Sequence, residues 1–296
     1  MPSTISAVHP SPDPAEQPLQ ELGLLRAELD RLDDALHDTL MQRAAVVERV
    51  AGTKDGIALR PGREAAILRR LLKRHSGPLP RQTIIRIWRE LFAGTTAMQG
   101  RFTVTVCDTD PGNSYAGLAR EHFGALTPLR VHRSPAQAIA EISAGTASAA
   151  VLPTPVEGEP SAIAWWTALL QRDEPRIYVV ARLPFWTPRP EGAPRGQALV
   201  VSTVAPDPTE RDRSLLGLEF APEVSRARLI AALTSAGFLA GPIILRREPG
   251  PAAGHALVDV EGHVSDGDPR LAALASIVRP PVILGAYAIP LAEGAS

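Results

Sequence analysis

One long apolar stripe near the N-terminus constrains the fold more than any other feature of this sequence. From Gln20 onward, leucine and valine recur at spacings of three and four residues, at Leu22, Leu25, Leu29, Leu32, Leu36, Leu40, Val47 and Val50. This spacing predicts one helix of about 30 residues, near 45 Å long, which needs a partner along its whole stripe. Residues 1–19 are rich in Pro and Ser and lack periodicity, so we expect a disordered leader there.

Two shorter helices follow the long one. The pattern predicts them over residues 62–75, ended by Ser-Gly-Pro-Leu-Pro, and over residues 81–99, ended by Gly100. Together they roughly match the first helix in length, but they cannot enclose it alone. We therefore expect two chains to share one helical core as a homodimer.

After Gly100 the pattern changes to alternating strands and helices. Strands are expected at 101–108, 128–134, 148–154 and 176–183, with helices between them at 115–124, 135–145 and 162–173. This alternation predicts a parallel α/β sheet unit. A Pro/Gly-rich connection at 185–196 leads to one further short strand at 197–204, so the second domain is expected to span 101–205.

The C-terminal segment, 213–291, has a different order of elements. Strands are expected at 214–221, 241–248, 255–264 and 282–291, with helices at 225–237 and 268–277. The order β-α-β-β-α-β is that of the ferredoxin-like α+β arrangement. The chain is thus expected to be multidomain: an all-α domain at 20–100, an α/β domain at 101–205 and an α+β domain at 213–291.

Composition excludes several classes of partner. The formal net charge is −1, so there is no general case for binding nucleic acid or a membrane surface. The single cysteine, Cys107, cannot form an internal disulfide. No cationic start followed by an apolar run marks a signal peptide, and no apolar stretch approaches the ~20 residues of a membrane span. We expect a soluble cytoplasmic protein.

Basic residues stand at informative places on the first helix. Arg43 interrupts the apolar stripe between Leu40 and Val47; it either lays its stem on the core, pairs with an acid such as Glu48, or serves a site. Arg26 lies 17 residues earlier, about 25 Å along a helix and about 100° around it. One small ligand cannot touch both arginines of one chain. If both serve a small ligand, Arg26 must reach the site of another subunit.

Other polar residues lie at helix ends. Lys54 closes the first helix, Arg63 and Glu64 open the second, and Gln99 ends the third. Each has a sufficient structural explanation, because Lys complements a helix C-terminus and Glu a helix N-terminus. Their joint order on three helices, with Arg26, Arg43 and the stretch Thr-Thr-Ala-Met-Gln ending at Gln99, closely resembles the all-helical chorismate mutase family over residues 20–100.

This resemblance implies a fold, a reaction and a set of site residues. The fold is an intertwined dimer, and the reaction is the Claisen rearrangement of chorismate to prephenate, which needs no nucleophile, metal or cofactor. Fixed cations suit it, because the enzyme must hold a flexible dianion in a compact conformer and stabilise charge on the breaking ether oxygen.

Each matching position carries an implied role. Arg26 of the partner and Arg43 bind the two carboxylates, supported by Arg63, while Lys54 and Gln99 donate hydrogen bonds to the ether oxygen. Glu64 holds the substrate hydroxyl, and Thr95 lies near the site. Arg60 departs from the family, in which many members carry an acid at that position.

The middle segment resembles a reduced prephenate dehydratase domain that has lost its site motifs. Ser114 and Tyr115 match one turn, but Asn113 replaces its glycine. The turn expected to carry an acid, an amide and a hydroxyl reads Pro-Thr-Pro-Val-Glu at 153–157, and the threonine motif falls on Gly-Gln-Ala at 196–198. Without an acid to protonate the leaving hydroxide, no dehydratase activity is expected. Glu157 is a less favoured candidate for that acid.

The C-terminal segment resembles the ACT regulatory domain of prephenate dehydratases. An aromatic amino acid effector could be met there by Arg247 and Glu248, although solvated charges at a strand end explain the same residues. The leading hypothesis is a chorismate mutase on a degenerate dehydratase and ACT scaffold. The alternatives are a bifunctional mutase and dehydratase regulated by phenylalanine, and a non-catalytic protein that senses amino acids or binds a partner.

Overall fold

A computed structural model describes residues 17–52, 56–108, 112, 114–171, 173–247 and 253–292. The chain divides into two compact units, residues 1–55 and residues 56–296. Among the described residues, no helix combines the length and the apolar character that crossing a membrane requires. The predicted boundaries near residues 100 and 205 both fall inside the second unit.

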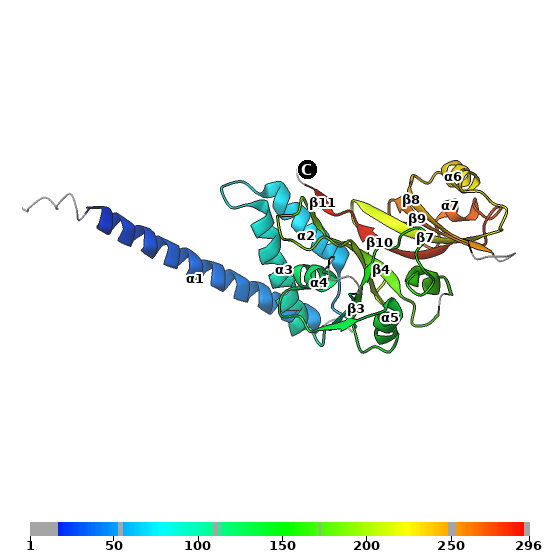
Figure 1. The fold of residues 1–296 in the computed structure, drawn as a ribbon. Coiled ribbons are helices and arrows are strands. Elements are labelled where there is room, and N and C mark those ends of the chain that lie inside the picture. The colour runs from blue at the N-terminus through cyan, green and yellow to red at the C-terminus, as the bar shows by residue number, and fades with distance from the viewer. Residues whose placement is uncertain are drawn as a thin grey trace, which may run out of the picture. The chain divides into compact units, whose positions relative to one another are not determined.

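The described residues of the first unit form the helix α1 (Gln17–Ala51), of 35 residues (Figure 1). Its length confirms the helix predicted from the apolar stripe, and residues 17–19 belong to it rather than to the leader. Leucines of the stripe are open to solvent in the single chain; Leu25 is 53% and Leu29 is 59% exposed. An apolar stripe of this length on one helix needs a partner surface.

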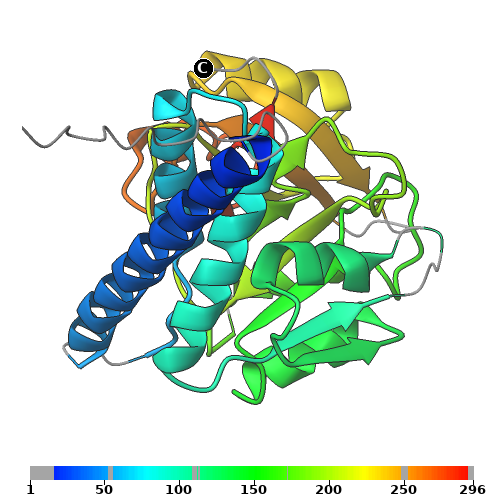
Figure 2. The same cartoon turned by 90° about the vertical axis from the view of Figure 1, so that its left-hand side faces the viewer.

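Helices α2 (Pro61–Arg74) and α3 (Arg81–Met98) begin the second unit and lie side by side (Figure 2). Pro61 occupies the first turn of α2, where its missing N–H is not needed. The buried side chains of α2 recur at spacings of three and four residues: Ala65, Leu68 and Leu72. They form one core with residues of α3 and with Phe185 and Trp186.

The rest of the second unit is built on one nine-stranded sheet, in the order β2-β1-β3-β6-β4-β10-β7-β9-β8. Its strands are β1 (Val104–Cys107), β2 (Leu129–His132), β3 (Ala149–Pro153), β4 (Tyr178–Leu183), β6 (Ala198–Ser202), β7 (Asp212–Phe220), β8 (Ala240–Arg246), β9 (Gly254–Glu261) and β10 (Val282–Ala288). A separate pair is formed by β5 (Trp186–Thr187) and β11 (Leu291–Ala292).

The sheet is mixed rather than parallel throughout. The four strands predicted to be parallel do run in one direction, because β1 pairs parallel with β2 and β3 while β6 pairs antiparallel with both β3 and β4. The prediction missed the insertion of β6 between β3 and β4. A short strand reached through a long connection can return in either direction, so its direction is not encoded in its apolar pattern.

Helices cover both faces of the first half of the sheet. Alternate residues of β1 and β3 enter different cores: Val104, Val106 and Val151 pack under α4 (Tyr115–Phe123), whereas Ala150 and Leu152 pack under α5 (Pro135–Ser143). The segment predicted as a helix at 162–173 forms the 3₁₀-helix η1 (Trp165–Gln171) on the α5 side. Short connectors commonly take this tighter turn.

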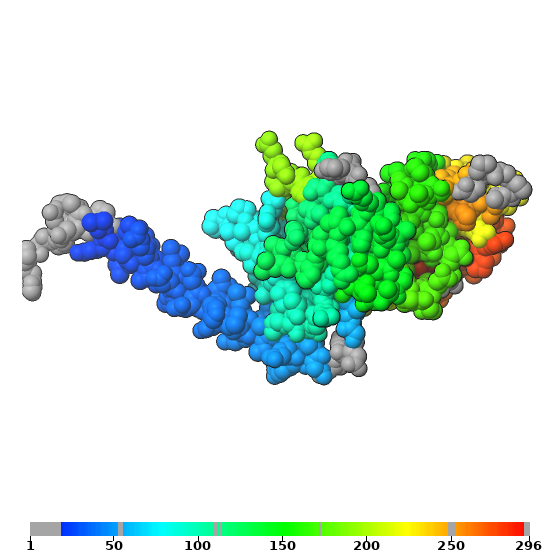
Figure 3. Space-filling model, turned by 60° about the horizontal axis from the view of Figure 1, so that its bottom comes forward, coloured from blue at the N-terminus to red at the C-terminus, as the bar shows by residue number. Residues whose placement is uncertain are grey.

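The C-terminal elements follow the predicted β-α-β-β-α-β order. They are β7, α6 (Arg226–Ser235), β8, β9, α7 (Pro269–Ala272) and β10, and their strand order β10-β7-β9-β8, antiparallel throughout, is the ferredoxin-like one. Figure 3 shows the middle segment, in green, and the C-terminal segment, in yellow to red, as one continuous surface. The ACT assignment of this segment stays a prediction.

A parallel contact between β4 and β10 joins the two halves of the sheet. Gly285 of β10 is opposite Val179 of β4 and has a φ of +138°. A Cβ atom at this position would lie 2.1 Å from the Val179 carbonyl oxygen, so only glycine permits the approach.

A hydrogen-bond network centred on Asp259 of β9 joins three strands of the C-terminal half. Asp259 accepts hydrogen bonds from Tyr287 Oη and Arg213 Nε, both at 2.6 Å. This buried network ties β7, β9 and β10 together.

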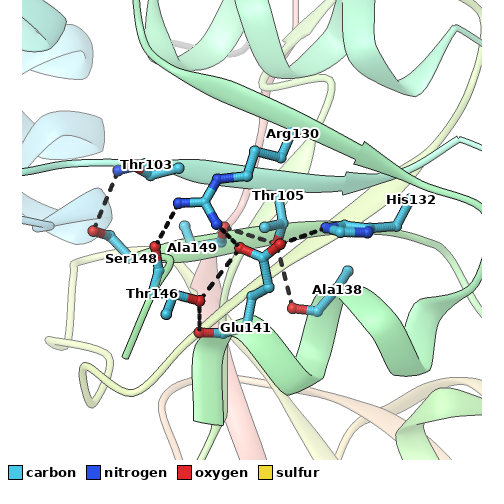
Figure 4. A network of polar contacts seen from close by, with 9 residues as sticks. All are labelled: Thr103, Thr105, Arg130, His132, Ala138, Glu141, Thr146, Ser148 and Ala149. Atoms are coloured by element: carbon cyan, nitrogen blue, oxygen red, sulfur yellow. Dashed lines mark hydrogen bonds and ion pairs between the residues drawn. The ribbon is translucent and has the colours of Figure 1, made fainter. Parts of the chain in front are cut away.

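The edge of the sheet at β2 is held by a more exposed network (Figure 4). Glu141 of α5 pairs with Arg130 and, at 2.9 Å from Nε2, with His132, both on the edge strand β2. Arg130 also donates to the Thr146 carbonyl oxygen at 3.0 Å. Charged side chains of this kind protect an edge strand from pairing with other chains.

Candidate functional site

The predicted site residues come from both units of the chain. Arg26 and Arg43 lie on α1, whereas Arg60, Arg63, Glu64, Thr95 and Gln99 lie on or beside α2 and α3. Lys54 lies outside the described residues. Because α1 is one continuous helix, the separation of about 25 Å between Arg26 and Arg43 holds along its axis. A small ligand therefore cannot contact both arginines of one α1.

The start of α2 places Arg63 and Glu64 in the first helical turn. Arg60 is the N-cap residue, and its carbonyl oxygen accepts a hydrogen bond from the Glu64 N–H at 3.1 Å. A Cβ atom on Gly62 would lie 2.9 Å from the Asp207 carbonyl oxygen, so glycine lets the chain before β7 pack against this turn. Among the described residues, the Arg60 side chain makes no hydrogen bond or ion pair.

Glu64 forms a buried ion pair that the sequence reasoning missed. Its Oε2 accepts from Nη1 of Arg89 on α3 at 2.7 Å, with side-chain exposures of 16% for Glu64 and 5% for Arg89. The Arg89 guanidinium also lies over the ring of Phe185, 4.9 Å from its centroid. Burial raises the pKa of Glu64 and lowers the pKa of Arg89, so desolvation outweighs the attraction within the pair.

Thr95 and Gln99 form hydrogen bonds within their own helix. The buried Thr95 hydroxyl donates to the Leu91 carbonyl oxygen at 2.8 Å, and the Gln99 Nε2 donates to the Thr95 carbonyl oxygen at 3.0 Å. Gln99 is the C-cap of α3, where the following Gly100 has a φ of +148°. The Gln99 amide is thus held at the end of α3, with its Nε2 engaged as a donor to the Thr95 carbonyl oxygen.

Arg63 points away from Glu64, into a basic cleft along α2. The cleft has a volume of about 720 Å³. Its basic lining residues are Arg63, Arg69, Arg70, Lys73, His75, Arg81 and Arg211, against one acid, Glu210. The Arg69 side chain has a structural role, because it donates hydrogen bonds to Thr209 and to the carbonyl oxygens of Arg211 and Ile289. The remaining cations make this face of α2 attractive to an anion.

At the C-terminal segment, Arg247 is bound to the turn before α6. It donates to the carbonyl oxygens of Pro222 and Val224, each at 2.6 Å, and lies over the ring of Phe220 at 5.0 Å. Glu248, the other expected effector residue, lies outside the described residues. Both terminal guanidinium nitrogens of Arg247 therefore donate hydrogen bonds to backbone carbonyl oxygens.

The dehydratase-like motifs are engaged in structural contacts. Glu157 forms an ion pair with Arg226, and Gln197 accepts from Arg182 at 3.1 Å. Ser114 adopts a left-handed conformation, with a φ of 49°, at the start of α4. Asn113 lies outside the described residues.

Arg89 and His122 were not predicted from the sequence, although each is a polar residue within the buried stripe of a helix. Arg89 lies four residues after Ile85 and three before Phe92, in the buried stripe of α3. It interrupts that stripe as Arg43 interrupts the stripe of α1, and the same reasoning would have identified it. His122 follows Leu118 by four residues on the buried face of α4 and is equally well marked.

A comparison with protein families finds a match to the family that the N-terminal helices were expected to resemble. Residues 25–100 match the family described as chorismate mutase type II. The N-terminal helices therefore carry a mutase-type domain, as the spacing of their polar residues predicted.

Known relatives extend the comparison beyond this segment. The chain is 26% identical over 141 residues to a bifunctional chorismate mutase/prephenate dehydratase of Stutzerimonas stutzeri, covering 45% of this chain and 38% of the relative. It is 30% identical over 100 residues to the protein of the same description from Neisseria gonorrhoeae, covering 33% of this chain and 27% of the relative. The chain thus matches well under two thirds of either relative's length. The crystal structure of a prephenate dehydratase from Streptococcus mutans aligns with a TM-score of 0.45 and 18% identity, covering 64% of this chain and 98% of that one.

Proposed function

We propose that this protein is a chorismate mutase, which rearranges chorismate to prephenate without a cofactor or a metal. The observation that carries the proposal is the match of residues 25–100 to the chorismate mutase type II family, together with the matching site residues. These residues are Arg26, Arg43, Lys54, Arg63, Glu64, Thr95 and Gln99.

The chemistry of these residues suits the reaction. The substrate is a flexible dianion, so arginines that hold both carboxylates restrict it to the reactive conformer. Arg43, Arg63 and the partner's Arg26 supply these cations, and the N-terminus of α2 adds the positive end of a helix dipole beside Arg63. Lys54 and the Gln99 amide then donate to the ether oxygen as it gains charge, which requires a reorientation of the Gln99 amide from its contact with Thr95.

The proposed enzyme is an intertwined homodimer. Arg26 and Arg43 are too far apart on α1 to serve one substrate within a chain, so Arg26 serves the partner's site. The exposed leucines of α1 provide an apolar surface for that assembly.

The dehydratase-like segment is proposed to lack dehydratase activity. Gly196, Gln197 and Ala198 offer no hydroxyl at the position of the proposed acid, and Glu157 is paired with Arg226. The C-terminal segment is proposed to be an ACT-like domain, with Arg247 and Glu248 as residues for an aromatic amino acid effector. Isothermal titration with phenylalanine tests this, and unchanged affinity in Arg247→Ala would exclude that residue.

A direct assay tests the mutase activity. Chorismate absorbance is followed after addition of the full chain, and phenylpyruvate is measured before and after acid treatment. We expect chorismate to disappear and phenylpyruvate to form only after acid treatment. No consumption of chorismate would refute the proposal, and phenylpyruvate before acid treatment, above a control without enzyme, would show an active dehydratase.

Variants test the residue roles. Arg43→Ala and Lys54→Ala should each lower kcat/KM by about 100-fold or more, whereas Arg31→Ala, an equal loss of charge at an exposed position of α1, should not. Full activity in Lys54→Ala would exclude this residue as the ether-oxygen donor.

Mixing variants tests the sharing of the site between subunits. In a heterodimer of Arg26→Ala and Arg43→Ala chains, one of the two sites keeps both arginines. A statistical mixture should therefore recover about a quarter of wild-type activity in a two-fold symmetric dimer. Heterodimers that form without any recovery would contradict the role of Arg26 in the partner's site.

A further inference from the structure

A cavity of about 170 Å³ lies within the second unit, between α3, α4 and the segment that joins β4 to β5. Its apolar lining includes Leu118, Leu183, Phe185 and Trp186. The cavity is separate from the basic cleft along α2, although Trp186 contributes to both. An apolar cavity of about 150 Å³ is large enough for a benzene ring, so this one can hold a single small organic molecule.

Two residues that line the same cavity, His122 and Arg189, have buried polar atoms without partners among the described residues. His122, in the last turn of α4, is 7% exposed, and neither of its ring nitrogens has a hydrogen-bond partner among the described residues. The buried Nε of Arg189 is likewise unpartnered within this part of the chain. Buried polar groups are nearly always hydrogen-bonded in folded proteins, so these nitrogens need a partner beyond the described residues, such as water or a bound molecule.

The charge of the lining favours an anion. Four arginines line the cavity, Arg86, Arg89, Arg120 and Arg189, against two acids, Glu90 and Glu121. Arg189 pairs with Glu121, Arg89 pairs with Glu64 outside the lining, Arg120 donates to the Ala125 carbonyl oxygen, and Glu90 accepts from the Ala125 N–H at 3.1 Å.

Arg89 and His122 place hydrogen-bond donors deep in the cavity. Arg89 uses only Nη1 for Glu64 and has further guanidinium N–H groups, among the five that an arginine carries. Burial, with the nearby Arg89 charge, lowers the pKa of His122 well below its usual value, so its imidazole is neutral and offers one N–H donor. A guanidinium beside a neutral N–H donor suits a carboxylate.

We propose that this cavity is a binding site for a small aromatic carboxylate, held by Arg89, His122 and Arg189, with its ring against Phe185 and Trp186. The carboxylate supplies the acceptors that Arg189 Nε and the protonated ring nitrogen of His122 lack, and the ring fills the apolar part. This site involves none of the residues assigned to the mutase reaction.

Occupancy of the cavity is linked to Glu64 through Arg89. A bound carboxylate competes with the Glu64 carboxylate for the same guanidinium, so each weakens the other's contact with Arg89. An effect of the ligand on chorismate turnover follows only if Glu64 acts in the mutase site, and this part rests on the proposed function. Binding itself does not.

Isothermal titration of the full chain with benzoate tests the site, with benzyl alcohol as a matched neutral compound. We expect one benzoate per chain and at least tenfold weaker binding of benzyl alcohol. Equal binding of the two compounds would show an apolar cavity without anion recognition and would overturn the proposal, as would no binding of benzoate at millimolar concentration.

Four variants separate this site from other surfaces. Arg89→Met and His122→Leu should each weaken benzoate binding at least tenfold, whereas Arg133→Met, an equal loss of charge at an exposed position outside the cavity, should leave it unchanged. Glu64→Gln removes the competing carboxylate and should tighten binding by about three- to tenfold. Unchanged affinity in His122→Leu, or in both Arg89→Met and Glu64→Gln, would overturn the site.

The readout distinguishes failure of this site from failure of the proposed function. If Arg89→Met does not fold, as circular dichroism would show, His122→Leu and Glu64→Gln decide the matter. Nitrogen NMR of the His122 ring provides a second measurement, because a bound carboxylate shifts the donor nitrogen. Benzoate binding with these variant effects supports the site even if the chain does not consume chorismate.

Discussion

Removal of Glu64 alone should destabilise the protein more than removal of the whole Glu64–Arg89 pair. In Glu64→Met, Arg89 stays charged with a side chain only 5% exposed, and it loses the ion-pair partner that it has among the described residues. An uncompensated buried charge of this kind costs about 3 kcal/mol, at the lower end of the range for broken buried pairs. In the double variant Glu64→Met, Arg89→Met, no charge is left, and two apolar side chains join the core of Phe92 and Phe185. We expect the double variant to lie within about 1 kcal/mol of the wild type.

The converse single variant should cost less, and its cost should depend on pH. In Arg89→Met, Glu64 can take up a proton, so we expect a loss of about 1–2 kcal/mol at pH 7.5. Burial already raises the pKa of Glu64 in the folded chain, and loss of Arg89 raises it further. A carboxyl whose folded pKa is above its unfolded pKa stabilises the fold at low pH and loses that contribution as the pH rises through the folded value. The free energy of unfolding of Arg89→Met should therefore be close to that of the wild type at pH 5 and clearly lower than it at pH 8.

Urea unfolding of the four chains, followed by tryptophan fluorescence, measures the cycle. The coupling energy should be about 3–5 kcal/mol at pH 7.5, because the single variants sum to about 4–5 kcal/mol and the double variant loses at most about 1 kcal/mol. The exposed pair of Arg279 and Glu219, with side-chain exposures of 75% and 31%, is the control and should couple by less than about 1 kcal/mol. If Glu64→Met and the double variant are equally unstable, the cost does not arise from a stranded Arg89 charge, and the reasoning is wrong.

Three further predictions concern other parts of the second unit. Cys107 is fully buried, and burial together with Asp108 raises the pKa of its thiol to about 11, so Ellman's reagent should react with it far more slowly in the folded chain at pH 8 than in urea; equal rates would contradict its burial. Burial and Asp259 raise the pKa of Tyr287 to about 12, so one of the three tyrosines should ionise late in a titration at 295 nm. Because that folded pKa exceeds the unfolded value near 10, stability should fall between about pH 10 and pH 12 in the wild type and less steeply in Tyr287→Phe. At the sheet edge, Glu141→Gln should cost less than about 1 kcal/mol by urea unfolding, because the Arg130 side chain is 47% exposed; a loss of 3 kcal/mol would show a stronger network.

The sequence predicts elements well where the apolar period is long and regular. The stripe from Leu22 to Val50 predicted α1 nearly to its ends, since a helical period over many turns has no competing explanation. The C-terminal order of elements was predicted correctly for a similar reason, because each strand is short, apolar and bounded by turn residues. The contact between β4 and β10 was not predictable. It depends on one close approach at Gly285, and no local pattern records which distant strand lies opposite a glycine.

The site is predictable in part, because residue type and spacing carry some of it. Arg63 and Glu64 were found as neighbours in sequence, but their opposite directions depend on what α2 packs against. Arg89 reaches Glu64 from another helix, and the cavity near His122 forms only where three distant segments meet. Sequence spacing measures distances along one helix and gives none between helices, so contacts of this kind require the structure.

The cations of α2 differ in the contacts that they make. Arg69 is fixed by three hydrogen bonds to the segment before β7 and to the residue after β10, so its charge serves packing. Arg63, Arg70 and Lys73 line the same basic cleft as Arg69, with Glu210 as the acidic residue of the described lining. Glu64 points inward and pairs with Arg89, so its carboxylate does not reduce the positive charge of the cleft. The first turn of α2 thus separates a positive outer face, suited to attract a dianion, from an inner carboxylate whose availability depends on Arg89. Since Arg89 also lines the cavity beside His122, the state of that cavity determines how firmly Glu64 is held.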